Sequence, residues 1–147
     1  MLVLLLTGGV EAATLVVCPS GCAFSSIQTA INASNNGDTI QVQSGTYHEN
    51  VNVTKQLTPR GIGNTVVDGG GSGSSIKLSA NGITLEGFTA TGGGYLPDAG
   101  IKVTSNNNML IGNNVSNNKN YGIYLLSSSN SNIFYNNFFN NINNIYI

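Results

Sequence analysis

The charged side chains of this chain are few, and they limit the chemistry it could perform. Of its 147 residues, six are acidic and five are basic. Hydrolysis of a glycosidic bond needs two carboxyl groups roughly 5–10 Å apart, and a lyase needs a base, usually beside carboxylates that hold calcium. The acidic residues are scattered, at Glu11, Asp38, Glu49, Asp68, Glu86 and Asp98. They form no recognisable acid pair or nucleophile–base set, so an enzyme is the less favoured interpretation.

Several of these carboxylates have structural explanations. Asp38 and Asp68 lie in glycine-containing turns, where Asp is common because its side chain bonds to the backbone. Glu86 falls on the register of Asn113, and Arg60 falls on the same register one turn earlier. We therefore expect an Arg60–Glu86 ion pair that is structural rather than catalytic.

The sharpest candidate for a binding site is the segment "YLPDAG". The interval from Phe88 to Val115 is longer than that from Val115 to Phe138, which predicts that this turn bulges outward. Inserted loops of solenoids often carry binding functions. Tyr95 could stack on a sugar ring, and Asp98 could bond to the sugar hydroxyls. The alternative, which we favour, is a tolerated insertion in which Pro and Asp only shape a turn.

The cysteines and sequons indicate an exported protein. Cys18 and Cys22 bracket a Pro-Ser-Gly turn and predict a short-loop disulfide. A metal site is less favoured because two cysteines and one histidine, His48, cannot supply four ligands, and we expect no metal or other cofactor. Three N-glycosylation sequons fit the same compartment, with acceptors at Asn32, Asn52 and Asn114.

The elements that must position these residues follow from an internal repeat. Residues 100–103 recur as 122–125 and again as 144–147, at one constant interval. A second set recurs at nearly the same interval and relates Leu110, Asn113, Val115 and Asn118 to Ile133, Asn136, Phe138 and Asn141. Upstream copies are read at Ile83, Glu86, Phe88 and Thr91, and more weakly at Leu57, Arg60 and Ile62. Repeats in the range of roughly 20–50 residues are typical of solenoids and propellers.

The pattern within each repeat predicts a parallel β-helix of about 22–27 residues per turn. Short runs alternate aliphatic and polar residues between Asn, Gly and Ser, and leave no room for a helix. Because successive turns lie about 4.8 Å apart, equivalent side chains stack. The expected interior columns are Ile76/Ile101/Ile123/Ile145 and Ile83/Leu110/Ile133. An outward column is expected from Lys77, Lys102, Tyr124 and Tyr146.

The many asparagines are expected at the bends of the solenoid. Asn113 and Asn136 predict an asparagine ladder, in which side-chain amides hydrogen-bond from one turn to the next. Asparagine also tolerates the left-handed backbone conformation that sharp corners require. A disordered polar tract is the alternative, which the regular spacing disfavours.

The two ends of the chain carry different signals. Phe24, Ile27, Ala30 and Ile31 have helical spacing, and Ser25 or Ser26 is placed to cap that helix, which predicts a short N-terminal capping helix. Residues 1–15 are expected to be a remnant of a secretory signal or, less favoured, a capping segment, and their apolar run is too short to span a membrane. No charged residue follows Lys119 and the sequence stops within a turn, so the C-terminal end is expected to be uncapped. Either more turns follow in a longer protein or, slightly favoured, this end stacks against the first turn of another subunit.

Residues 16–147 resemble right-handed parallel β-helix proteins of the pectin-lyase-like superfamily, especially repeat-rich archaeal and bacterial surface or periplasmic proteins. The resemblance rests on "SIQTAI", "GDTIQV", "GTYHENV" and "NTVVDGGG". It implies a right-handed solenoid in a single domain. Enzymes of that superfamily act on acidic polysaccharides, but the fold supports many activities.

These signals together predict a secreted structural or cell-surface module. Head-to-tail stacking of copies would build filaments if the contact does not close into a ring. The alternative is a domain that binds or acts on extracellular polysaccharide, through Tyr95 and Asp98 or through the stacked tyrosines Tyr124 and Tyr146. A net charge of −1 argues against nucleic acid as a partner.

Overall fold

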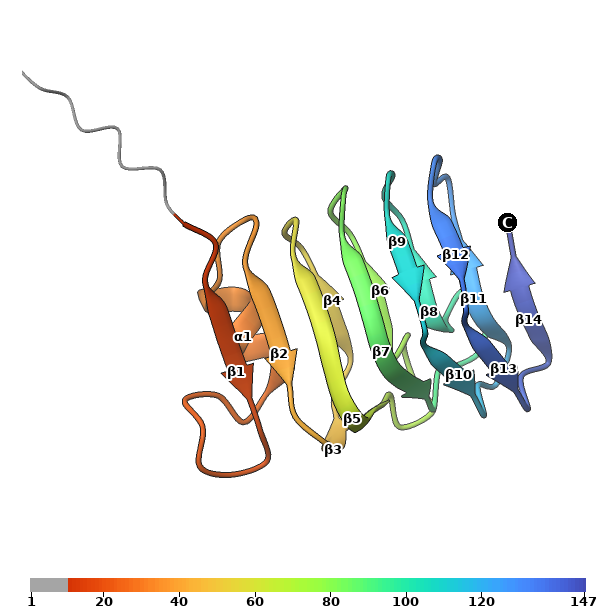
Figure 1. Cartoon of the computed structure of the whole chain (residues 1–147). Helices are drawn as coiled ribbons and strands as arrows, with labels where there is room; N and C mark the ends of the chain where they lie inside the picture. The colour runs from red at the N-terminus through yellow and green to blue at the C-terminus, as the bar shows by residue number, and fades with distance from the viewer. Residues whose placement is uncertain (1–10) are drawn as a thin grey trace, which may run out of the picture.

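The chain forms a parallel β-solenoid of about six turns with one short helix, α1 (Ile27–Ala33) (Figure 1). The computed structural model describes residues 11–147. The strands are β1 (Thr14–Val17), β2 (Thr39–Val42), β3 (Gly45–His48), β4 (Val51–Val53), β5 (Thr58–Asp68), β6 (Ile76–Leu78), β7 (Thr84–Thr91), β8 (Ala99–Val103), β9 (Met109–Ile111), β10 (Asn114–Ser116), β11 (Tyr121–Leu125), β12 (Asn132–Phe134), β13 (Asn137–Phe139) and β14 (Asn143–Tyr146). The predicted fold class is confirmed.

The strands form two parallel sheets because each turn carries the chain around the same axis in the same sense. One sheet has nine strands and runs from β1 to β12 and β13, and the other has five strands in the order β14-β11-β8-β6-β4. Strand β1 already pairs with β2 from Thr14 onward, so the solenoid includes the last part of the segment 1–15. The rest of the predicted signal or capping segment, residues 1–10, lies outside the described residues.

The first predicted interior column is confirmed by the strand register. Ile76 pairs with Ile101, Ile101 with Ile123, and Ile123 with Ile145. The outward column of Lys77, Lys102, Tyr124 and Tyr146 follows from the same pairings. Aliphatic side chains from successive turns therefore share one dry interior, which is the main source of stability in this fold.

The second predicted column is wrong in its upstream part. Leu110 pairs with Leu85, not with Ile83, and with Ile133 on the other side. Ile83 is also fully buried. A register shift of two residues moves the pairing from one inward position to the next and keeps the alternation of inward and outward side chains, so the sequence pattern is the same for both registers.

The same slip affects the positions assigned around it. Val115 pairs with Ala90 and not with Phe88, so the turn that contains "YLPDAG" is lengthened less than the sequence suggested. Glu86 lies opposite Ile111 and is not on the register of Asn113. The predicted Arg60–Glu86 ion pair is nevertheless confirmed, because Arg60 pairs with Glu86 across the two turns.

Bends between strands use residues that accept a left-handed backbone. Among residues 11–147, six residues other than glycine have a positive φ near 55°, and four of them are asparagines, at Asn107, Asn117, Asn130 and Asn140. Asparagine is the residue that tolerates this conformation best after glycine. The predicted role of asparagine as a bend residue is therefore confirmed.

Candidate functional site

The helix α1 closes the N-terminal end of the solenoid through charged and amide side chains of the next turn. Ser26 is the N-cap residue, and Ile27, Ala30 and Ile31 are buried, as the helical spacing predicted. Glu49 accepts hydrogen bonds from the backbone N–H groups of Ile27 (2.8 Å) and Gln28 (3.0 Å). A carboxylate at this position satisfies helix donors that would otherwise lack partners, and it complements the positive end of the helix dipole.

The other end of α1 is held by a cation, and a half-buried glutamine of the helix bonds to a strand edge. Lys55 Nζ donates to the carbonyl oxygens of Ile31 (3.0 Å) and Asn32 (2.9 Å) in the last turn of the helix. Gln28 accepts from the N–H of Asn52 (2.7 Å) and donates to its carbonyl (3.2 Å). Gln28 thus supplies to β4, the edge strand of the five-stranded sheet, the bonds that a neighbouring strand would make.

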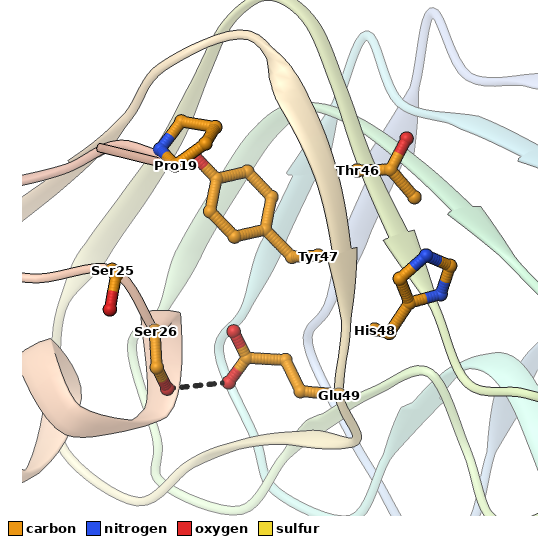
Figure 2. Close-up of a pocket in the computed structure, with 7 residues that line it drawn as sticks. All are labelled: Pro19, Ser25, Ser26, Thr46, Tyr47, His48 and Glu49. Carbon is orange, nitrogen blue, oxygen red and sulfur yellow. Dashed lines mark hydrogen bonds between the residues drawn. The ribbon is translucent and has the colours of Figure 1, made fainter.

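A cavity of about 360 Å³ lies beside this cap, lined by Pro19, Ser25, Ser26, Thr46, Tyr47, His48 and Glu49 (Figure 2). The Glu49 carboxylate is the chemical group of interest there, but its oxygens are bonded to the helix N-terminus and to Ser26 Oγ (2.9 Å). His48 points away from Glu49 and lies 3.4 Å from Asp68, Nδ1 to Oδ2. The cavity therefore brings together no acid–base pair.

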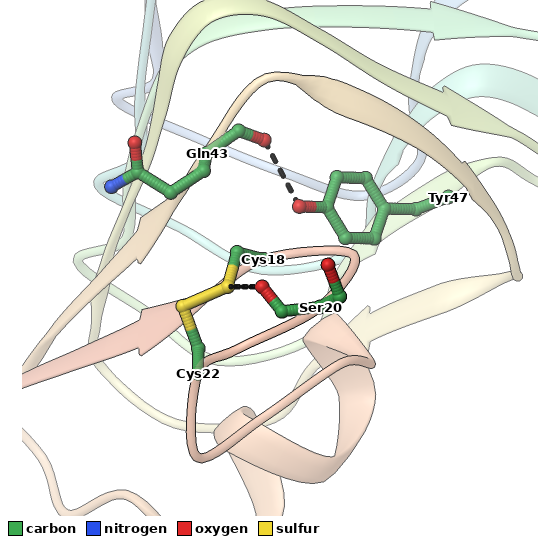
Figure 3. Close-up of a disulfide and its surroundings, with 5 residues drawn as sticks. All are labelled: Cys18, Ser20, Cys22, Gln43 and Tyr47. Atoms are coloured by element: carbon green, nitrogen blue, oxygen red, sulfur yellow. Dashed lines mark hydrogen bonds between the residues drawn. A yellow bond between two sulfur atoms is a disulfide. The ribbon is translucent and has the colours of Figure 1, made fainter.

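The disulfide predicted from the Pro-Ser-Gly turn is confirmed: Cys18 and Cys22 are joined next to Tyr47 (Figure 3). The Tyr47 hydroxyl donates to the carbonyl of Gln43 (3.0 Å), and burial, followed by the charge of Glu49, raises the pKa of Tyr47. The disulfide occupies the part of the first turn where later turns have a bend and a strand. It is a structural feature, and disulfides of this kind are typical of proteins in oxidising compartments.

A second cavity, of about 200 Å³, lies on the outward face of the five-stranded sheet. Its lining residues are Asn50, Val51, Asn52, Ser74, Lys77, Asp98 and Lys102. Neither Lys77 nor Lys102 makes an ion pair among residues 11–147. We define the lysine–tyrosine face as Lys77, Lys102, Tyr121, Tyr124 and Tyr146. Lys102 Nζ lies 5.7 Å from the ring centroid of Tyr124, which joins the basic and aromatic parts of this face.

Three tyrosines gather at the aromatic end of this face. The ring centroids of Tyr121, Tyr124 and Tyr146 are 5.1–5.4 Å apart. Tyr124 and Tyr146 were predicted from the repeat, whereas Tyr121 was missed. Tyr121 lies three positions before Tyr124 in β11, and simple alternation along a strand places such residues on opposite faces.

The two residues of the loop predicted to bind sugar, Tyr95 and Asp98, have different neighbours. Tyr95 is 68% exposed, and the ammonium of Lys119 lies 5.2 Å from its ring centroid. Asp98 instead lines the cavity beside Lys77 and Lys102 and accepts from Ser74 Oγ (3.3 Å). Tyr95 is not among the residues that line this cavity, so Tyr95 and Asp98 do not form one binding site there.

The three sequon asparagines differ in their contacts. Asn32 is exposed at the end of α1. Asn52 is half-buried in β4, and its Oδ1 accepts from Ser79 Oγ (2.7 Å). Asn114 is half-buried in β10, and its Oδ1 is buried without a partner among the described residues. Their glycosylation stays a prediction.

The asparagine ladder joins the last two turns as the spacing predicted. Asn113 Nδ2 donates to Asn136 Oδ1 (3.0 Å), which also accepts from the backbone N–H of Asn113 (2.9 Å). A second ladder, which the sequence analysis did not assign, has the same form: Asn141 Oδ1 accepts from the Nδ2 (2.8 Å) and the N–H (3.2 Å) of Asn118. Its signal, the repeat interval shared with the first ladder, was present in the sequence.

The C-terminal turn presents an open edge. Its strands β12, β13 and β14 have no following turn among the described residues, and β14 lies at the opposite end of the stack from α1 (Figure 1). Ile145 is 41% exposed, although its column neighbours Ile101 and Ile123 are fully buried. Phe139 and Ile142 are also largely exposed.

The fold and these contacts define a parallel β-solenoid with a capped N-terminal end and no assembled catalytic group in the described part. The chain is similar to a protein named cell surface glycoprotein from Methanothermus fervidus, with 32% identity over 96 residues. The match covers 63% of this chain but only 16% of that relative's length. No family model matches the sequence.

Two further properties of residues 11–147 bear on the site. They contain no helix long and apolar enough to cross a membrane. They also contain no cluster of three or more His, Cys, Asp or Glu side chains placed to hold a metal ion.

Proposed function

We propose that this chain is an extracellular structural module of a cell surface, a secreted β-solenoid whose role is to hold shape and to stack on similar turns. The observation that carries the proposal is that charged side chains of this chain make structural contacts within and between turns. Glu49 and Lys55 hold the two ends of α1, and Arg60 pairs with Glu86 between turns. The disulfide and the name of the distant relative are consistent with such a location. Membership of the pectin-lyase-like superfamily, with its right-handed winding, is part of the same proposal.

Self-association is the form of this proposal that can be tested most simply. Strands with free backbone groups and exposed aliphatic side chains pair readily with another chain. A head-to-tail contact between copies is heterologous and gives filaments when it does not close. Sedimentation velocity and electron microscopy of the purified chain test it: concentration-dependent fibres support stacking of copies, whereas a monomer at all concentrations contradicts it.

A second candidate function is the binding of an acidic polysaccharide along the lysine–tyrosine face. Two lysines without an ion-pair partner in the described chain and three clustered tyrosines are favourable for anionic sugars, because the ammonium groups attract carboxylates and the rings stack on sugar faces. Titration with acidic glycans tests this candidate. Lys77→Ala and Tyr124→Ala should each weaken binding, and Lys119→Ala, outside this face, should not. Equal affinity of all three variants would contradict it.

A further inference from the structure

Asn52 is the first residue of the outward column on the five-stranded sheet. It pairs in register with Lys77 of the next turn. The column then continues through Lys102 to Tyr124. Because neighbouring strands lie about 4.8 Å apart, these side chains form one line along the solenoid axis. Asn52, a sequon asparagine, is therefore a direct neighbour of the lysine–tyrosine face.

The side-chain amide of Asn52 has one bonded group and one free group. Its Oδ1 accepts from Ser79 Oγ (2.7 Å), whereas its Nδ2 donates to no other residue among residues 11–147 and is not buried. Both backbone groups of Asn52 bond to Gln28, which fixes the strand from which this side chain projects. Asn52 also lines the cavity of about 200 Å³, so a substituent on Nδ2 would lie at that cavity.

Among the three sequons, the one at Asn52 leaves its hydroxyl residue most accessible in the folded chain. Thr54 is exposed, whereas Ser34 and Ser116 are only 3% and 6% exposed. Ser34 Oγ also donates to the carbonyl of Ile31 (2.7 Å). The hydroxyl two positions after the asparagine is part of the acceptor motif for N-glycosylation, so the folded structure favours Asn52 as the modified residue.

The cavity beside Asn52 offers the polar groups that a sugar ring requires. Asn50 Nδ2 donates to the carbonyl of Ser74 (3.0 Å), which leaves Asn50 Oδ1 to accept from a sugar hydroxyl. Asp98 Oδ1 accepts from Ser74 Oγ (3.3 Å) and leaves Oδ2 as a second acceptor. The two lysines of the lysine–tyrosine face line the same cavity, and their ammonium groups supply donors for sugar oxygens.

We infer that Asn52 carries an N-linked glycan and that the first sugars of this glycan lie on the lysine–tyrosine face. Attachment joins Asn52 Nδ2 to the anomeric carbon of an oligosaccharide carried on a lipid phosphate. The bond from that carbon to the phosphate oxygen breaks, the lipid phosphate leaves, and Nδ2 gives up one proton. Because Oδ1 is unchanged, its bond from Ser79 remains and orients the linkage.

The attached glycan accounts for a basic and aromatic surface without other partners in the described chain. The linkage sugar occupies the cavity, where Asp98 accepts from its hydroxyls and the ammonium groups donate to its oxygens. The following sugars lie over Lys102 and reach Tyr124, whose ring stacks on a sugar face. This inference rests on the proposed extracellular role, and it names the chain's own glycan, in place of an external polysaccharide, as the occupant of this face.

The test uses the whole chain secreted by a yeast, behind a signal peptide of the host, with glycans of the high-mannose type. Mass spectrometry of glycopeptides should find Asn52 occupied. An endoglycosidase that cuts within the glycan core should release this glycan at least about tenfold more slowly from the folded chain than from the denatured chain, because its contacts must open first. The double variant Lys77→Ala/Lys102→Ala should restore fast release, whereas Lys119→Ala, outside this face, should not.

The outcomes separate the inference from the function on which it rests. An unoccupied Asn52, or equally fast release from the folded and denatured chains, overturns the inference. Slow release that persists in the double lysine variant overturns it as well, since the glycan is then shielded by something other than this face. Sedimentation velocity of the same preparations tests stacking separately: fibres formed by a chain with an unoccupied Asn52 leave the proposed function standing and the inference wrong. A monomer whose Asn52 glycan is released slowly supports the inference and contradicts stacking.

Discussion

The two ends of this solenoid solve the same problem differently. At the N-terminal end, α1 covers the core, and Gln28 bonds to both backbone groups of Asn52 at the edge of the five-stranded sheet. At the C-terminal end, β14 has no neighbour on its outer side within the described chain, and Ile145 is partly exposed. The comparison shows that residues of one column contribute unequally to the stability of the fold. Their contribution depends on whether a turn or a cap lies beyond them.

The largest difference is expected between two members of the same isoleucine column. Ile123→Ala should lower the free energy of unfolding by about 2–5 kcal/mol, because it removes a fully buried side chain between two turns. Ile145→Ala, in the same column at the open edge, should cost only about 0.5–1 kcal/mol. Urea denaturation of both variants measures this, and equal losses would break the comparison.

The asparagine ladder should show a smaller contrast of the same kind. Asn113→Ala leaves the N–H of Phe88 and the carbonyl of Leu85 without their buried partner, and we expect a loss of about 1–3 kcal/mol. The control is Asn137→Ala in β13, whose exposed side chain makes no hydrogen bond within the described chain, and this change should cost less than about 0.5 kcal/mol. Thermal denaturation compares the two, and a larger loss for Asn137 would refute the ladder as a stabilising element.

The cap can be weakened through its carboxylate. Glu49→Ala removes the acceptor of two helix N–H groups and should cost about 1–2 kcal/mol. The matched change Glu86→Ala breaks only the exposed pair with Arg60 and should cost at most about 1 kcal/mol. If both variants lose the same stability, Glu49 is not the group that holds α1. Limited proteolysis should also show earlier cleavage near α1 in Glu49→Ala alone.

The smallest expected effect is a pH dependence at the N-terminal end. The backbone N–H groups of Asn35 and Ala13 bond to the Asp38 carboxylate and hold its pKa below the usual value. Because the pKa is lower in the folded chain than in the unfolded one, this stabilisation is present above about pH 4 and is lost as the pH falls through the folded-state value. The Asp38→Asn variant should therefore lose less stability than the wild type on acidification below about pH 4. An identical pH profile for the two proteins would contradict this assignment.

Much of the fold was predictable because the repeat is regular in the C-terminal half of the chain. The constant repeat interval placed Ile101, Ile123 and Ile145 in one column, which the register confirms. The upstream turns were misplaced by one inward position, since Ile83 and Leu85 are both buried and alternation alone cannot choose between them. The long strand β5 adds a register shift after Arg60, and Ile62, read as the equivalent of Val115, is 37% exposed there.

The candidate site was less predictable, because it depends on contacts between distant residues. The helical spacing predicted α1 but not that Glu49 and Lys55 hold its ends from the following turn. Tyr121 joined the aromatic cluster against the alternation rule, and Tyr95 and Asp98 proved to have different neighbours. Stacking can be read from periodicity, whereas side-chain partners across a turn require the register to be known first.

Native-state hydrogen exchange tests the central claim most directly, by comparing backbone amides at the two ends with those between them. The account predicts that the Asn52 amide, bonded to Gln28, is protected to a degree close to that of Ile123, while the amides of Asn136 and Asn141 exchange nearly as fast as unprotected ones. Strong protection of Asn136 and Asn141 in this chain, or rapid exchange at Asn52, would contradict the account, in which Gln28 closes the edge at Asn52 and the last described turn lacks such partners.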